Sequence, residues 1–70
     1  MDKKLAAIVY SNLGLAYFKN KNYIKSELNC TEAIWLNENY HKAYVRRAEA
    51  RRRLNKEIDA ISDLRKASLL

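Results

Sequence analysis

The sequence predicts an all-α fold made of two stacked antiparallel helical hairpins, and three observations point to it. The chain has no proline and one glycine among 70 residues, with abundant Ala, Leu, Lys, Glu and Arg, which is a helical composition. Apolar residues recur at intervals of three and four, as they do along one face of a helix. Several residues recur 34 positions later: Tyr10 as Tyr44, Ala16 as Ala50, Ile24 as Ile58, Ala33 as Ala67 and Leu36 as Leu70. This period is typical of helix–turn–helix repeats, which stack into solenoids and usually hold another chain in a groove.

The first hairpin is expected to consist of helices from about Lys3 to Lys19 and from about Tyr23 to Leu36. The polar residues 19–22 separate them, and Asn tolerates the left-handed conformation that such a turn often needs. The apolar positions of the two helices are Leu5, Ile8, Val9, Leu13, Ala16 and Tyr17, followed by Tyr23, Ile24, Cys30, Ala33 and Ile34. Because the connection is short, the two helices should be antiparallel neighbours.

The second hairpin follows the polar break at residues 37–39. Its first helix is expected from about Tyr40 to Leu54, with Tyr44, Ala48 and Leu54 on the apolar side. Asn55 and Lys56 then turn the chain into a last helix. The residues of that helix expected to face inward are Ile58, Ile61, Leu64 and Ala67.

Small residues occupy positions where helices must approach closely. Gly14 and Ala48 lie in the first helix of each hairpin, and Ser26 and Ala60 lie early in the second. A glycine inside a helix costs about 0.5–1 kcal/mol relative to alanine. We therefore expect the neighbouring helix to leave no room for a Cβ at Gly14.

The length and composition of the chain, and the motifs it lacks, exclude several kinds of protein. A chain of 70 residues makes one domain with a thin core, and its single cysteine cannot form an internal disulfide. We expect Cys30 to be a buried, unreactive thiol and His41 to be a surface residue, with no metal site and no cofactor. No nucleophile elbow or glycine-rich phosphate loop is present, so no catalytic residue and no enzyme are predicted. No run of 18 apolar residues occurs, so no membrane insertion is predicted, and the expected location is cytoplasmic.

The positive charge is concentrated in one helix. Of the net charge of +6, residues 42–53 contribute +5. The charged residues of this segment are Lys42, Arg46, Arg47, Arg51, Arg52 and Arg53, with Glu49 as the only acid. This clustering favours an anionic partner, which on charge alone could be a peptide, a nucleic acid or a lipid.

The chain resembles the tetratricopeptide repeat (TPR) family from Ala7 to Leu70. The residues at the signature positions of the family are Tyr10, Leu13, Gly14, Tyr17, Ser26 and Ala33 in the first repeat, and Tyr44, Ala48, Ala60, Leu64 and Ala67 in the second. The resemblance implies one segment, residues 1–70, with repeats at about 7–40 and 41–70, in a TPR-type α-solenoid that forms a right-handed superhelix. Arg51 replaces an aromatic residue, Cys30 a larger apolar residue and Glu38 a proline, so the second hairpin is expected to pack less well around Arg51.

Three residues resemble the carboxylate-clamp subset of TPR domains. These are Asn12 in Ser-Asn-Leu-Gly, and Lys42 and Arg46 in Lys-Ala-Tyr-Val-Arg-Arg-Ala. Such domains bind the acidic C-terminal tails, ending in EEVD, of heat-shock chaperones. The resemblance implies that the first helix of each hairpin lines the groove and that Asn12, Lys42 and Arg46 hold this peptide, in a co-chaperone or adaptor.

The residue chemistry agrees with this resemblance. Lys42, Arg46, Glu49 and Arg53 follow one another at intervals of four, three and four, which places them on one stripe of a helix. Amide, ammonium and guanidinium groups are suited to binding carboxylates. Leu15, Phe18, Glu49 and Arg53 are secondary groove candidates, and Ile8 is a further apolar one. Glu49 is expected to pair with a neighbouring arginine. Arg47 and the arginines at 51–53 are expected to be solvated charge, and at most Arg53 and Arg52 are expected to reach the groove.

Two other functions are compatible with the sequence. One is a basic helical scaffold that binds the phosphates of a nucleic acid, although no aromatic residue lies between Arg46 and Arg53 to stack on bases. The other is a structural unit that forms homo-oligomers through its open repeat ends, with the outward-facing Trp35 in the contact. Two repeats are fewer than the three or so needed for independent stability, so a fragment of a longer array is also expected.

Overall fold

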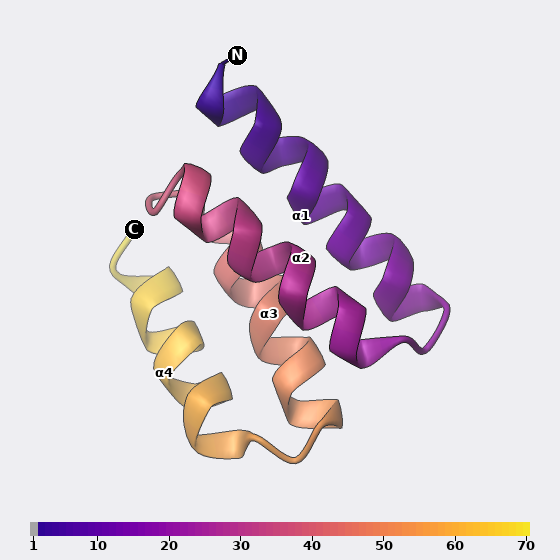
Figure 1. The fold of residues 1–70 in the computed structure, drawn as a ribbon. Coiled ribbons are helices and arrows are strands. Elements are labelled where there is room, and N and C mark those ends of the chain that lie inside the picture. Colours follow the sequence, from indigo (N-terminus) through magenta and orange to yellow (C-terminus); the bar gives the residue numbers. More distant parts are fainter. Residues whose placement is uncertain (1) are drawn as a thin grey trace.

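The computed structural model describes residues 2–70, which form four helices in two antiparallel hairpins (Figure 1). The helices are α1 (Lys3–Lys19), α2 (Tyr23–Leu36), α3 (His41–Arg53) and α4 (Glu57–Ser68). The all-α prediction is confirmed, and the bounds of α1 and α2 are the predicted ones. Helix α3 is one residue shorter than predicted at each end, because Tyr40 and Leu54 are its flanking cap residues. No helix within this described range is long and apolar enough to cross a membrane.

The turns inside the two hairpins repeat the same backbone conformation 34 residues apart. Lys21 has a φ of 61° and Asn55 a φ of 62°, both in the left-handed region. Asn55 takes this conformation in the second hairpin, but in the first, where an asparagine is expected, Lys21 takes it. Asn22 has another role, because its side-chain oxygen accepts a hydrogen bond from the Lys25 amide at 3.2 Å and so caps the start of α2.

The first hairpin is closed by contacts too short to admit a larger residue at Gly14. The Ser26 hydroxyl donates a 2.7 Å hydrogen bond to the Gly14 carbonyl across the two helices. A Cβ at Gly14 would lie 2.5 Å from Sγ of Cys30 and 3.3 Å from the Ser26 carbonyl oxygen. The predicted close approach at this glycine is therefore confirmed. Cys30 itself is fully buried, and burial raises the pKa of its thiol to about 11, so almost no reactive thiolate exists near neutral pH.

The core consists mainly of small side chains, which lets the helices pack closely. The buried hydrophobic residues are Ala6, Ala7, Cys30, Ala33, Ala43, Tyr44, Ala48, Ala50, Ala60 and Ala67. Helix α2 packs against α3 and so joins the two hairpins, and α1 also touches α3 (Figure 1). This stacking places the first helix of each hairpin beside the other.

The two outermost helices differ from the prediction. Among the four α4 residues expected to face inward, only Ala67 is buried, while Ile58, Ile61 and Leu64 are 84%, 56% and 40% exposed. The α1 residues predicted on its apolar face but exposed are Leu5, Ile8, Val9, Leu13 and Ala16. The cause is position, since α1 and α4 lie at opposite ends of the stack and each has a neighbour on only one side (Figure 1). Within the described residues, the outer faces of α1 and α4 are therefore apolar and exposed to solvent.

Candidate functional site

The first part of the candidate site is a contact between Arg46 of α3 and two polar residues of α1. Its Nη1 donates to the Ser11 hydroxyl at 2.9 Å and to Oδ1 of Asn12 at 3.2 Å. Ser11 is fully buried, whereas Asn12 is exposed. Both acceptors are neutral, and within residues 2–70 no carboxylate pairs with Arg46. The guanidinium is therefore held in position while its positive charge is not neutralised.

The expected juxtaposition of Asn12 and Arg46 across successive hairpins is thus present. Sequence reasoning missed Ser11, although a small polar residue beside Asn12 inside a helix is a signal for an interhelical hydrogen bond. Because Oδ1 of Asn12 accepts from Arg46, its amide NH₂ is left to donate to another group. Lys42 lies one helical turn before Arg46 and is exposed, with no hydrogen bond or ion pair to the part of the chain described.

The second part is a small apolar pocket next to Arg46. It has a volume of about 90 Å³ and is lined by Leu15, Phe18, Val45, Arg46 and Glu49. Three of the predicted secondary groove residues therefore share one pocket. Val45 was not predicted, although it lies three residues after Lys42 and four before Glu49 and so shares their face. Ile8 is not part of the lining.

Glu49 differs from its expectation. No arginine or lysine of residues 2–70 forms an ion pair with it, and it is exposed at the pocket wall. Its nearest cations in the sequence stripe, Arg46 and Arg53, bind neutral groups instead. The pocket wall thus carries one carboxylate, that of Glu49, and one guanidinium, that of Arg46, which do not form an ion pair.

The third part is Arg53, which lies against two aromatic rings. Its Nη1 donates to the Tyr23 hydroxyl at 3.0 Å. The centre of its guanidinium is 5.4 Å from the ring centroid of Phe18 and 5.6 Å from that of Tyr23. The two rings meet edge to face with their centroids 5.2 Å apart. Cation–π contacts orient a guanidinium without cancelling its charge. Arg52 does not share this position and lies beside Ala60, Ile61 and Leu64 of α4.

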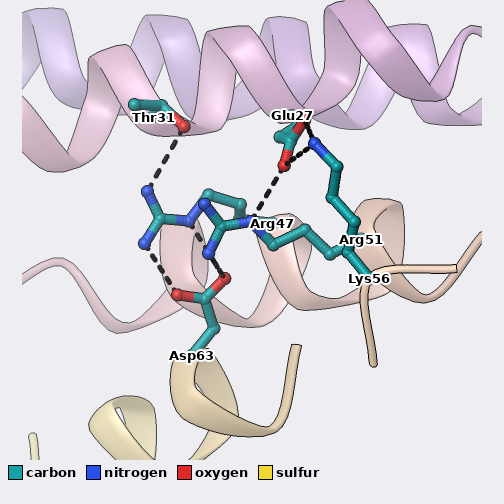
Figure 2. A network of polar contacts seen from close by, with 6 residues as sticks. All are labelled: Glu27, Thr31, Arg47, Arg51, Lys56 and Asp63. Atoms are coloured by element: carbon teal, nitrogen blue, oxygen red, sulfur yellow. Dashed lines mark hydrogen bonds and ion pairs between the residues drawn. The ribbon is translucent and has the colours of Figure 1, made fainter. Parts of the chain in front are cut away.

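Arg47 and Arg51 correct the prediction of solvated charge. They belong to a network of six residues that ties α2, α3 and α4 together (Figure 2). Arg47 binds both carboxylate oxygens of Asp63, at 2.7 and 3.0 Å, and also donates to the Thr31 hydroxyl at 3.2 Å. Arg51 donates to Asp63 and to Glu27, each at 2.9 Å. These side chains are mostly buried, with Arg47 14%, Arg51 20% and Asp63 4% exposed.

The network also corrects the expectation that Arg51 leaves the second hairpin loosely packed. It occupies the interface as an ion-paired group, and Glu27 receives a further bond from Lys56 at 3.0 Å. Burial acts to raise the pKa of Glu27, but the hydrogen bonds from Lys56 and Arg51 outweigh it and leave that pKa lowered. The stabilisation from this carboxylate is therefore complete above its usual pKa and is lost as the pH falls through the lowered value.

Trp35 and His41 lie where the sequence predicts. Trp35 is 82% exposed, on the outer side of α2, and borders a cavity of about 250 Å³ together with Ile34 and Tyr44. His41 is exposed at the start of α3. Neither Trp35 nor His41 lines the apolar pocket next to Arg46.

Comparison with known proteins places this geometry in context. Residues 7–40 match the family model of the tetratricopeptide repeat. The chain is 33% identical over 69 residues to protein unc-45 homolog B of Xenopus laevis and 47% identical over 45 residues to RNA polymerase II-associated protein 3 of Xenopus tropicalis. These alignments cover 99% and 64% of the chain, which spans only 7% of the length of each relative.

A solved structure is similar over most of the fold. It is the second TPR of Spaghetti (RPAP3) bound to the HSP90 peptide SRMEEVD, with a TM-score of 0.90 and 39% sequence identity. The match covers 91% of this chain and 59% of that one. With four helices in two stacked hairpins and the 34-residue period, the chain belongs to the tetratricopeptide repeat family and resembles the TPR domains of co-chaperones.

Proposed function

We propose that this chain is a non-catalytic peptide-binding module that captures the acidic C-terminal tail of a heat-shock chaperone of the HSP90 type, as part of a co-chaperone or adaptor. The observation that carries the proposal is the Arg46 guanidinium, which the second hairpin supplies and which Ser11 and Asn12 of the first hairpin hold. The positive charge is fixed in place before a ligand arrives, so little side-chain entropy is lost on binding. The bound peptide of the similar Spaghetti domain has the complementary charge.

The proposed binding mode uses three polar side chains, one from α1 and two from α3. Arg46 and Lys42 provide positive charge for the terminal carboxylate and the acidic side chains of the peptide, and the Asn12 amide donates a hydrogen bond. The neighbouring pocket, lined by Leu15, Phe18 and Val45, receives an apolar side chain. The resulting ligand is a chain end with acidic and apolar residues close together. We further propose a cytoplasmic location, since a lone reduced thiol suits a reducing compartment.

The alternative of nucleic-acid binding is weakened by the ion-pair network. Arg47 and Arg51 hold Asp63 and Glu27, so two of the arginines in the basic segment have little charge to offer to phosphates. Association of copies through the open end faces has more support, because α1 and α4 both present apolar residues to solvent. It concerns different surfaces from the peptide groove and is compatible with peptide binding.

The proposal is tested by titrating fluorescent SRMEEVD peptide into the 70-residue chain and following anisotropy at low salt. Replacing Arg46 by alanine should weaken binding by about tenfold or more, since a hydrogen bond to a charged group contributes about 1.5–3 kcal/mol. Lys42→Ala, at an exposed site whose side chain makes no hydrogen bond or ion pair within residues 2–70, should weaken it by about threefold.

The matched control is Arg52→Ala, which removes the same charge from the same helix on the side of α4. It should change the affinity by less than about twofold, because the lost charge is screened and remote from the groove. Far-UV circular dichroism checks that each variant keeps its helices. Equal affinities for the wild type, Lys42→Ala and Arg46→Ala would contradict the proposal.

A further inference from the structure

The arginines of α3 fall into two groups with different partners. Arg47 and Arg51 bind carboxylates in the interior. Arg46 and Arg53 face α1 and the start of α2, where they bind only neutral hydroxyl, amide and aromatic groups. Oriented guanidinium groups without an acidic partner within residues 2–70 occur on this side of the helix alone. Both retain their charge for an external anion.

One of these guanidinium groups lines the apolar pocket, and the other contacts a residue of the pocket wall. Arg46 forms part of its lining, and Phe18, which also lines it, is the ring under Arg53. The two residues are seven positions apart, so they lie about 10 Å apart along the helix axis. An extended peptide advances about 3.3 Å per residue and would cover this distance in three residues. In a peptide that runs along α3 with its C-terminal residue at Arg46, the residue three positions before the C-terminal one would therefore lie beside Arg53.

The alternation of side chains in an extended peptide also determines which peptide residue faces Arg53. Successive side chains point to opposite sides, so the first and third residues before the terminal one share a side. If the first fills the pocket of Leu15, Phe18 and Val45, the third points to the same wall, at Arg53. The second points away from it. Glu49, an unpaired carboxylate of this wall, disfavours an acidic side chain inside the pocket itself.

From this geometry we infer that Arg53, which packs against Phe18 and Tyr23, is a second anion-binding subsite of the groove. This subsite selects an acidic side chain three residues before the C-terminal residue of the bound peptide. The inference rests on the proposed function and adds a specificity determinant to it. In SRMEEVD the residue at this position is the first glutamate, and the valine occupies the pocket position. Arg53 and the first glutamate are therefore expected to form an ion pair.

The experiment measures the affinities of three peptides, SRMEEVD, SRMQEVD and SRMEQVD, for the wild type and for Arg53→Gln. The wild type should bind SRMEEVD about fivefold more tightly than SRMQEVD, which corresponds to the upper end for an exposed ion pair. In Arg53→Gln this ratio should fall to less than about twofold. The ratio of SRMEEVD to SRMEQVD should be the same in both proteins, because the second glutamate faces away from Arg53.

Two results would overturn the inference while the proposed function stands. One is a wild type that binds SRMEEVD and SRMQEVD equally, although Arg46→Ala weakens both. The other is an Arg53→Gln variant that keeps the full preference for SRMEEVD. If the wild type binds none of the three peptides, or if Arg46→Ala has no effect on any, the proposed function fails and the subsite fails with it. The comparison of peptides on the wild type requires no variant to fold.

Discussion

Replacing Asp63 by alanine is expected to lower the free energy of unfolding by about 3–5 kcal/mol, the usual cost of removing one partner from a buried ion pair. Asp63 is buried and accepts hydrogen bonds from both Arg47 and Arg51. Without the carboxylate, two mostly buried guanidinium groups lose their main counter-charge. Thr31 and Glu27 retain one bond each to the arginines and cannot replace the lost ones.

Urea unfolding followed by far-UV circular dichroism measures this effect, with the helical signal as the readout. A loss of this size is comparable to the whole stability of many small domains, so the variant should be partly unfolded without denaturant at 25 °C. Glu32→Gln is the matched control, since it removes one negative charge from an exposed position of α2. It should change stability by less than about 0.5 kcal/mol. An Asp63→Ala midpoint equal to that of the wild type would show that the network contributes nothing to stability.

Replacing Gly14 by alanine is expected to destabilise the chain by about 1–2 kcal/mol, even though alanine is the better helix former. Alanine gains about 1 kcal/mol of helix propensity over glycine. Its Cβ, however, would lie 2.5 Å from Sγ of the fully buried Cys30, and overpacking of this kind costs about 1–3 kcal/mol, occasionally more. Displacing α2 to relieve the contact would also weaken the 2.7 Å hydrogen bond from Ser26 to the Gly14 carbonyl.

A double-mutant cycle separates this steric cause from a general effect on α1. Cys30→Ala removes the sulfur, so Gly14→Ala should cost about 1 kcal/mol less in a Cys30→Ala background than in the wild type. Thermal unfolding of the four proteins provides the comparison. Additive effects of the two substitutions, or a Gly14→Ala variant more stable than the wild type, would contradict the account of this glycine.

The helices and their ends could be predicted from the sequence because the signals are local. Three-to-four periodicity, polar breaks and a 34-residue period need no knowledge of distant residues, and the predicted bounds are within one residue for α1, α2 and α3. The role of Gly14 could also be predicted, since a glycine inside a helix is costly unless a neighbouring helix requires it. Which residue takes the left-handed turn in the first hairpin could not, because Lys21 has no intrinsic preference for it.

The ion-pair network could not be predicted from helical spacing alone. Arg47 and Arg51 look like a solvated stripe of α3, and their partners Asp63 and Glu27 lie in two other helices, between 12 and 24 residues away. One signal was nevertheless present. Asp63 lies between Ala60 and Ala67 on the buried stripe of α4, and a buried carboxylate requires a cation. An acid on the buried stripe of α4 and an arginine in place of a core aromatic residue both depart from the usual repeat pattern. Their charges are opposite, so each can neutralise the other.

The exposed apolar residues of α1 and α4 show a different limit. Periodicity identifies the apolar side of a helix but not whether another element covers it. Ile58 and Ile61 have the spacing of core residues and yet are mostly exposed, because α4 is the last helix of the stack. The position of an element in the array, rather than its own sequence, decides this.

The candidate site combines predictable and unpredictable parts in the same way. The pairing of Asn12 with Arg46 follows from their places in successive repeats, and the structure brings the two together. The hydrogen bond from Arg46 to Ser11 and the packing of Arg53 against Phe18 and Tyr23 depend on how side chains pack in three dimensions, so the sequence does not predict them. Together they leave two oriented charges on one side of α3 and two neutralised charges on the other. We therefore propose that one helix serves both stability and peptide recognition.

The central claim is that Arg46 and Asn12 bind the C-terminal carboxylate of an acidic peptide. The most direct test compares the binding of SRMEEVD that has a free C-terminus with that of the same peptide amidated at its C-terminus. Amidation is expected to weaken binding to the wild type by about tenfold, because charge-assisted hydrogen bonds to the terminal carboxylate are lost. In Arg46→Ala this difference should shrink to less than about twofold. Equal binding of the free and amidated peptides to the wild type would contradict the role of Arg46 and Asn12.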